Sequence, residues 1–247
     1  RCISGSCHLL DTGNERILLD CGSFMEKEYL ARNSKFPFNA VSVDLVAVSH
    51  AHSDHCGRLP LLFSKGFIGP VICVPPTKDI ASIMLDIQLM INKMDSRFLP
   101  YSRYDIKSAL SNFWEKEYGQ SYQMLSGTEI QLFPAQHILG SSIIKVVFKT
   151  HGKKKTLLFT GDFGNAETTI LKDKPVFKET DYLLIESTYG GKTHGNYAEE
   201  QNKFYQILRQ TYFDAGVAII PSYVLDRTQK VLTLIYKGKK LGIIPAD

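Results

Sequence analysis

Residues 50–55, with the sequence HAHSDH, bring three histidines and one aspartate together. Imidazole nitrogens and carboxylate oxygens are ligands that zinc takes in proteins, and a catalytic zinc also keeps one position open for water. Burying these groups without a cation would leave several polar atoms needing partners, each at a cost of about 1–3 kcal/mol when unmet. The cluster therefore predicts a metal site.

An apolar stretch, residues 41–48, precedes the cluster and predicts a buried strand. Because residues two apart point to the same side of extended backbone, His50 and His52 are expected to face one metal position. Asp54 and His55 continue around the turn towards a second position. Two ions need more ligands than one hexapeptide supplies, so further donors are expected elsewhere.

Four more polar residues stand at the ends of other predicted strands. Asp20 closes a strand at 16–20, His137 follows one at 129–133, Asp162 follows one at 156–160, and Glu186 closes one at 182–186. The ends of several strands converge on one edge of a sheet, where α/β folds place their chemistry. His137 and Asp162 are therefore the expected additional metal donors.

The remaining pattern alternates strands with helices and predicts the α/β class. Further strands are expected at 6–10, 71–74, 142–148 and 217–220, and helices at 57–63, 105–118, 197–213 and from about Asp226. Another helix is expected after Thr77 as its N-cap, with a buried face of Ile80, Ile83, Met84, Ile87, Met90 and Ile91. Leu110, Phe113 and Trp114 are expected to point inward, and residues 190–193 to form a hinge before a smaller second part.

Composition limits the classes of protein to which the chain can belong. With 247 residues, of which 44% are hydrophobic, it can bury a full core. The net charge of +4 is compatible with a polyanionic substrate without requiring one. Five cysteines without a CxxC pair predict reduced thiols and a cytoplasmic protein. No uncharged apolar stretch of about 18 residues is present, so a membrane span is not expected.

Taken together, these motifs resemble those of the metallo-β-lactamase superfamily. Residues 50–55 match its HxHxDH signature, and Asp20 in LLDCG, His137 in QHILGSS and Asp162 in FTGDFG match later motif residues in order and spacing. Glu186 in ESTYG and the segment PSYVLDRTQ at 221–229 resemble motifs of the β-CASP branch, which contains RNA-processing nucleases.

The resemblance implies an αββα sandwich over residues 1–192 and the beginning of an inserted α/β β-CASP domain over residues 193–247. It also implies that the chain is truncated at both ends, because the first strand and the later histidine motifs of the branch are missing. Those later motifs supply a general acid and the last zinc ligand. Residues 1–247 alone are therefore expected to be weakly active or inactive.

Roles for the motif residues follow from the same resemblance. His50, His52 and His137 would hold one zinc ion, Asp54 and His55 the other, and Asp162 would bridge the two, with manganese as an alternative metal. Asp20 would orient a ligand imidazole, and Glu186 would hydrogen-bond a catalytic or ligand group.

Four positions depart from the branch pattern. Gln136 stands where glycine is common, Tyr223 and Asp226 stand where phenylalanine and glycine are usual, and Lys230 stands where an acid is common. These departures concern the fit of the substrate rather than metal binding.

The leading functional expectation is cleavage of RNA phosphodiester bonds by two-metal hydrolysis, with a homodimer or an RNA-processing complex as candidate assemblies and no membrane partner. Two alternatives stay open. One is a small-substrate hydrolase of the thioesterase or lactamase type, and the other is a non-catalytic scaffold subunit of an RNA-processing complex. The sequence leaves open whether cleavage is endo- or exonucleolytic and whether RNA is preferred to DNA.

Overall fold

A computed structural model describes residues 2–94, 99–164, 171, 175–193 and 195–245. The chain divides into two compact units, Arg1–Glu186 and Ser187–Asp247. No helix of the described residues is long and apolar enough to cross a membrane.

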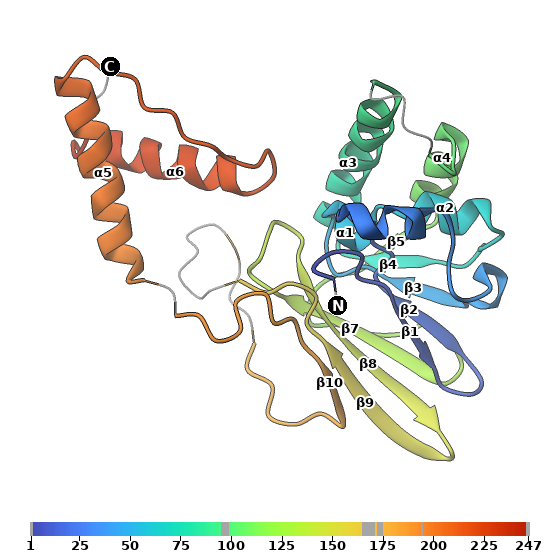
Figure 1. The fold of residues 1–247 in the computed structure, drawn as a ribbon. Coiled ribbons are helices and arrows are strands. Elements are labelled where there is room, and N and C mark those ends of the chain that lie inside the picture. Colours follow the sequence, from blue (N-terminus) through green and yellow to red (C-terminus); the bar gives the residue numbers. More distant parts are fainter. Residues whose placement is uncertain (1, 95–98, 165–170, 172–174, 194, 246–247) are drawn as a thin grey trace. The chain divides into compact units, whose positions relative to one another are not determined.

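The first unit contains two five-stranded sheets (Figure 1). In sheet A, β1 pairs with β2 in antiparallel fashion and the remaining neighbours are parallel. Its strands, in spatial order, are β1 (His8–Asp11), β2 (Arg16–Leu19), β3 (Leu45–Ala47), β4 (Val71–Cys73) and β5 (Phe113–Glu115).

Sheet B is antiparallel except for its last pair, β10 with β9. Its spatial order is β10 (Tyr182–Leu184), β9 (Lys153–Phe159), β8 (Ser142–Thr150), β7 (Thr128–Pro134) and β6 (Ser121–Gln123).

The two sheets face each other across a buried apolar core. Ile17, Leu45 and Ile72 of sheet A belong to the same core cluster as Ile130, Ile144 and Phe159 of sheet B. Alternation along each strand places the neighbouring residues on the outer faces. The α/β class and the two facing sheets are therefore confirmed.

Helices cover the outer face of sheet A, on the side away from sheet B (Figure 1). They are η1 (Lys27–Ser34), η2 (Ala40–Ser42), α1 (Ser53–Cys56), α2 (Leu59–Ser64), α3 (Pro75–Met94) and α4 (Arg103–Ser111). Within the described residues of this unit, no helix covers the outer face of sheet B, where Phe133, Phe163 and Phe177 pack around Ile143 and Leu158.

Helix α3 was predicted with the wrong buried face. Its buried residues are Thr77, Ala81, Leu85 and Leu89, whereas Ile83, Ile87, Met90 and Ile91 are exposed. Both stripes have helical spacing, and the buried one packs Leu85 and Leu89 against Leu61 of α2 and Ile106 of α4. Thr77 is not the N-cap, because the helix begins at Pro75, where the missing N–H of proline costs nothing.

The predicted helix 105–118 is wrong beyond Ser111, where α4 ends. Residues Phe113–Glu115 form β5, which pairs with β4 at the edge of sheet A. Phe113 is buried as expected, but Trp114 points outward and is 51% exposed. Aromatic residues fit the half-buried surface of a strand, and pairing with β4 favours the strand here. The strand expected at 41–48 is also shorter, because residues 40–42 form η2 and β3 spans only Leu45–Ala47.

The second unit contains two helices, α5 (Tyr197–Phe213) and α6 (Arg227–Lys240), close to the predicted bounds. Tyr205 is buried between them and donates its hydroxyl to the carbonyl oxygen of Leu234 at 3.1 Å. The strand expected at 217–220 is wrong: the segment is irregular, and Val217 and Ile219 are each 87% exposed. A strand requires a neighbour, and no described strand pairs with this segment.

Candidate metal centre

The histidines and aspartates predicted from the sequence lie in loops at one edge of the two sheets. The loop after β3 carries His50 and His52 and leads into α1, which carries Asp54 and His55. Backbone hydrogen bonds hold the contributing loops together: Ser142 N donates to Ser49 O at 2.7 Å, and Gly164 N donates to Ala135 O at 2.9 Å. The sheets thus position segments that are far apart in sequence around one site.

Four of the predicted ligands converge on one point. The ligand atoms of His50, His52, His137 and Asp162 all lie within 4.8 Å of one another. The Nδ1 atom of His52 lies 3.0 Å from Nε2 of His50 and 3.2 Å from Nε2 of His137. Oδ2 of Asp162 lies 3.6 Å from Nε2 of His137 and 3.9 Å from Nε2 of His50.

These spacings fit a tetrahedral cation. Bonds of about 2.0–2.1 Å from zinc to nitrogen or oxygen place the ligand atoms about 3.3–3.4 Å apart, within the observed range. Hydrogen bonds alone do not account for these contacts. Nδ1 of His52 has either one proton or one lone pair, so it can form only one hydrogen bond, yet it faces the Nε2 atoms of both His50 and His137. The donor set therefore fits a divalent metal ion.

Asp54 and His55 lie on the other side of Asp162. Nε2 of His55 is 3.3 Å from Oδ1 of Asp162 and 3.7 Å from Oδ2 of Asp54. The two oxygens of Asp162 thus face different groups: Oδ2 faces His50 and His137, and Oδ1 faces His55. This arrangement has the form of a carboxylate between two cation positions.

Asp20 lies behind His55 and is fully buried. Its Oδ1 accepts a hydrogen bond from Ser49 N at 2.7 Å, and its Oδ2 accepts from Nδ1 of His55 at 2.7 Å and from the hydroxyls of Ser6 and Ser49 at 3.0 and 2.9 Å. A carboxylate accepts only, so His55 carries its proton on Nδ1. Nε2 of His55 is then left to face Asp54 and Asp162.

Ser49 is a site residue that sequence reasoning missed. Its hydroxyl donates to Asp20, so its oxygen is left to accept from Nδ1 of His50, which lies 3.0 Å away. Ser49 therefore orients His50 with Nε2 towards the cation position, in the way that hydrogen-bonded partners orient metal ligands. The only signal in the sequence is a hydroxyl residue directly before the first histidine.

Glu186 lies at the end of β10, beside the loop that carries Asp162. Its Oε1 accepts a hydrogen bond from Phe163 N at 2.8 Å, and its own backbone N–H donates to Thr160 Oγ1 at 3.2 Å. Glu186 thus holds the backbone next to Asp162.

A close approach at Gly22 fixes the position of α1. A Cβ atom at Gly22 would lie 1.6 Å from the carbonyl oxygen of Asp54, so only glycine fits there. On either side, Cys21 N donates to His55 O and Ser23 N donates to Ser53 O, each at 2.8 Å. The loop after β2 therefore holds α1, which carries the predicted ligands Asp54 and His55, in position.

Burial and neighbouring groups shift the pKa of His50 in the same direction and that of His55 in opposite directions. Burial lowers the pKa of His50 well below its ordinary value, and the neighbouring histidines lower it further, so its imidazole is neutral and ready to ligate. For His55, burial also lowers the pKa, but the charges and hydrogen bonds of Asp20 and Asp162 outweigh it and raise the pKa to about 11. Burial raises the pKa of Asp54.

Metal binding at pH 7 is expected to release about one proton, because a cation must displace the proton that Asp20 and Asp162 hold on His55. That proton stabilises the metal-free fold fully below the ordinary pKa of 6.5, and the contribution is lost as the pH rises towards about 11. Isothermal titration calorimetry at pH 7, in two buffers that differ in ionisation enthalpy, measures the proton count. A heat of binding that does not depend on the buffer contradicts the prediction.

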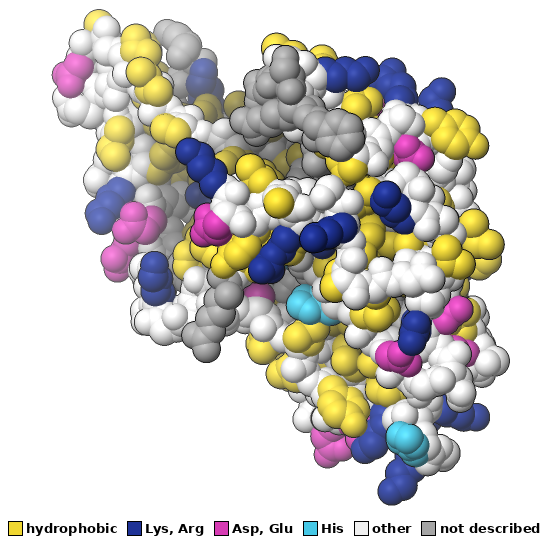
Figure 2. Space-filling model, turned by 45° about the vertical axis from the view of Figure 1, so that its right-hand side comes forward, with side chains coloured by type: hydrophobic (Ala, Val, Ile, Leu, Met, Phe, Trp, Pro, Cys, Tyr) yellow, Lys and Arg dark blue, Asp and Glu magenta, His cyan; other side chains and the backbone are white. Residues whose placement is uncertain are grey.

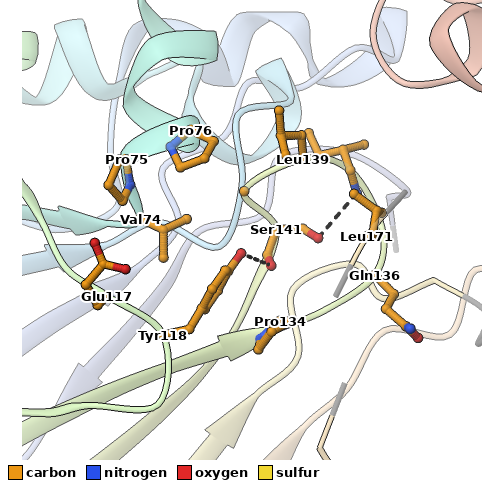
Figure 3. A pocket seen from close by; sticks show the side chains of 12 residues that line it. Val74, Pro75, Pro76, Glu117, Tyr118, Pro134, Gln136, Leu139, Ser141 and Leu171 are labelled. Carbon is orange, nitrogen blue, oxygen red and sulfur yellow. Dashed lines mark hydrogen bonds between the residues drawn. The ribbon is translucent and has the colours of Figure 1, made fainter. Parts of the chain in front are cut away.

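A pocket of about 280 Å³ lies beside the loop that carries His137 (Figure 3). Pro75, Pro76 and Leu139 give it an apolar wall, and the Tyr118 hydroxyl at its floor donates to Ser141 O at 2.8 Å. Gln136 lines the same pocket. The pocket is therefore lined by Gln136 and Ile138, the two neighbours in the chain of the predicted ligand His137.

Two of the sequence departures occupy left-handed backbone. Gln136 has φ of 59° and Asp226 has φ of 68°, which explains why glycine suits both positions. Asp226 combines its φ with a ψ of −55°, a strained conformation that glycine adopts more easily. Asp226 also forms an ion pair at 2.6 Å with Lys230, which lies one turn into α6. These two residues, which both depart from the branch pattern, thus pair with each other.

Lysine and arginine side chains are spread between hydrophobic and uncharged ones over the face shown in Figure 2 and do not gather into one continuous patch there. Net basicity therefore adds little to the functional argument.

Comparison with known proteins gives both a family and curated relatives. Residues 1–200 match the metallo-beta-lactamase superfamily. The chain is 36% identical over 244 residues to "Ribonuclease TTHA0252" of Thermus thermophilus, which covers 98% of this chain and 54% of the relative. It is 32% identical to "Probable RNase MJ4" of Methanocaldococcus jannaschii, covering 94% of this chain and 54% of the relative.

A third relative is "Transcription termination factor FttA" of Methanococcus maripaludis, at 31% identity over 99% of this chain and 39% of the relative. The chain thus spans about half the length of the first two relatives and less of the third. The two facing sheets, the convergent His50, His52, His137 and Asp162, and the match over residues 1–200 agree, and the chain belongs to the metallo-β-lactamase superfamily.

Proposed function

We propose that the protein hydrolyses phosphodiester bonds of RNA with the help of divalent metal ions. The observation that carries this proposal is the position of Asp162, whose two oxygens face separate groups of ligands. RNA is supported as the substrate by relatives that are named ribonucleases.

Two metal ions, zinc or manganese, fit the donor set. His50, His52 and His137 would hold the first, Asp54 and His55 the second, and Asp162 would lie between them. When bound, the ions would supply a Lewis acid that lowers the pKa of water and neutralises charge on the phosphate.

The protein's own residues fix the site on one side and leave the other side open. The side chains of His50 and His55 are 0% and 6% exposed, whereas those of Asp54, His137 and Asp162 are 27–29% exposed. Asp20, Ser49 and Glu186 hold the ligands from behind. Among the described residues of the first unit, the partly exposed side of Asp54, His137 and Asp162 is therefore the expected side of approach for a phosphate.

Assignment to the β-CASP branch is part of the proposal. It is supported by the motif at Glu186 and by a second unit with two helices, α5 and α6, that follows it. In this proposal, residues 1–192 are the metallo-β-lactamase domain and residues 193–247 are the beginning of the inserted domain. A cytoplasmic location is supported by five cysteines that are all unpaired. A homodimer or an RNA-processing complex is the proposed assembly.

A small-substrate hydrolase is the second candidate. The 280 Å³ pocket beside His137, with its apolar wall, favours it, because a small acyl group would fit there.

The complete protein, incubated with single-stranded RNA and separately with a thioester, distinguishes the two candidates. Cleavage of RNA is expected to stop on chelation, to return with zinc or manganese, and to fall at least about 100-fold in His52→Ala. His151→Ala, in an exposed turn, is the control and is expected to cleave normally. Turnover of the thioester with no cleavage of RNA would contradict the proposal.

A further inference from the structure

An exposed tryptophan lies on the outermost strand of sheet A. Trp114 is the only tryptophan in residues 1–247, and it is 51% exposed. It belongs to β5, which pairs with β4 and is the last strand of its sheet among the described residues. Tryptophan rings are enriched at interfaces and dominate binding energies there, so the surroundings of this ring are informative.

A lysine connects this ring to a second aromatic ring. Nζ of Lys116 lies 5.8 Å from the centroid of the Trp114 ring and 4.7 Å from that of Tyr122. The Tyr122 hydroxyl donates to Oε1 of Gln120 at 2.9 Å and accepts from Glu117 N at 3.1 Å, which fixes its ring in place. We call Trp114, Lys116 and Tyr122 the Trp114 cluster. It holds a cation between two aromatic rings.

The charge of Lys116 has no acidic partner in the part of the chain that the structure describes, although glutamates flank it in the sequence. Glu115 pairs instead with Lys78 at 2.6 Å. Glu117 lines the pocket beside His137. The cluster therefore presents a positive charge next to an aromatic surface that is half open to solvent.

The cluster lies at the edge of sheet A that carries the predicted metal ligands. Because β3, β4 and β5 are parallel, their carboxyl ends meet at one edge. The loop after β3 carries His50 and His52, and Lys116 directly follows β5. Lys116 N also donates to Cys73 O, at the carboxyl end of β4, at 2.8 Å. The sheet thus places the cluster and the metal loop on the same edge.

One pocket joins the loop of the cluster to the loop of His137. Glu117 and Tyr118, which directly follow Lys116, line the pocket of about 280 Å³ (Figure 3). The Tyr118 hydroxyl donates to Ser141 O at 2.8 Å, and the Ser141 hydroxyl accepts from His137 N at 3.0 Å. A nucleic acid strand bound at the metal centre can therefore continue across this pocket to the cluster.

We propose that the Trp114 cluster binds one nucleotide of single-stranded RNA, with the base stacked on Trp114 and a phosphate next to Lys116. Every base has a π face, so stacking on an aromatic side chain holds single strands of any sequence, and a neighbouring cation attracts the backbone. In a duplex, neighbouring base pairs cover these faces. The proposal rests on the proposed hydrolysis of RNA and names unpaired RNA as the substrate.

Binding of the complete protein to labelled single-stranded RNA of about 16 nucleotides is measured by fluorescence anisotropy, with a chelator present so that the RNA is not cleaved. Trp114→Ala is expected to weaken binding about 5- to 150-fold, whereas Trp114→Phe, which keeps an aromatic face, is expected to retain most of the affinity. Tyr104→Ala removes a ring that is 76% exposed on α4 and is the control, expected to bind like the parent protein. If Trp114→Ala fails to fold, Trp114→Leu takes its place with the same expectation.

Salt dependence and RNA that lacks bases separate the two contacts. Lys116→Gln is expected to reduce the slope of log affinity against log salt concentration by about 0.7, as the loss of one phosphate contact to a single strand does, and Trp114→Ala is expected to leave the slope unchanged. Lys107→Gln, an exposed lysine on α4, is the control for charge. With a strand of equal length that lacks bases, and with a fully paired duplex, Trp114→Ala is expected to bind like the parent protein.

Equal affinity of the parent protein and Trp114→Ala for single-stranded RNA, with cleavage by the parent protein intact, overturns this proposal alone. A loss of affinity in Trp114→Ala that is as large for the strand without bases shows a structural role and also overturns it. A parent protein that neither binds nor cleaves RNA overturns the proposed function as well.

Discussion

Asp162→Asn is expected to reduce RNA cleavage by the complete protein about 10²- to 10⁴-fold. The substitution weakens metal binding, and bound metal ions stabilise the transition state by several kcal/mol. The substitution keeps the shape of the side chain but removes the charge that Oδ2 presents to His50 and His137 and that Oδ1 presents to His55. Steady-state cleavage rates and metal content, measured on the same preparation, test this prediction.

The matched control for this variant is Asp181→Asn. Asp181 lies in the same unit, but its carboxylate is exposed and pairs with Lys155 at 2.6 Å on the surface. Such exposed pairs contribute little, so its cleavage rate and metal content are expected to equal those of the parent protein. Full activity in Asp162→Asn would show that the carboxylate has no part in the chemistry.

Asp20→Asn is expected to weaken metal binding about 10- to 100-fold although Asp20 touches no metal position. Asparagine tolerates the φ of 59° at this position, so the backbone is expected to stay in place. The new amide group faces Nδ1 of His55, which now donates to Oδ2. Two donors cannot bond each other, so the proton of His55 is expected to move to Nε2, where it blocks ligation.

Metal titration measures the affinity, and nitrogen NMR of the imidazoles reports the tautomer. Loss of Asp20 also removes a charge that raises the pKa of His55, so that pKa is expected to fall from about 11. Asp44→Asn is the control, since Asp44 Oδ2 accepts from the backbone of Arg16 at the surface of the same sheet. An Asp20→Asn protein with parental affinity and an unchanged His55 tautomer is incompatible with the orienting role.

The convergence of four candidate metal ligands could be expected from residue type and spacing. His50 and His52 follow β3 of sheet A. His137 and Asp162 follow β7 and β9, which both run antiparallel to β8 in sheet B and so end at the same edge. Apolar stretches of the right length located these strands, but their pairing was not predicted.

Other features were decided by packing, which a single sequence does not contain. The buried stripe of α3 holds Leu85 and Leu89 rather than Ile83 and Ile87, because it packs against Leu61 of α2 and Ile106 of α4. Trp114 was assigned to a helix because aromatic residues occur in both helices and strands, and pairing of β5 with β4 decided between them.

The supporting residues of the site were the hardest to predict. Ser49 links Asp20 to His50 through one hydroxyl, and a single serine has no signature in a sequence.

Anomalous X-ray diffraction at the zinc absorption edge, from crystals of the complete protein grown with zinc, tests the central claim most directly. We predict two peaks about 3.5–4 Å apart, one bounded by His50, His52 and His137 and the other by Asp54 and His55, with Asp162 between them. A single peak, or peaks remote from these residues, would contradict the two-metal centre.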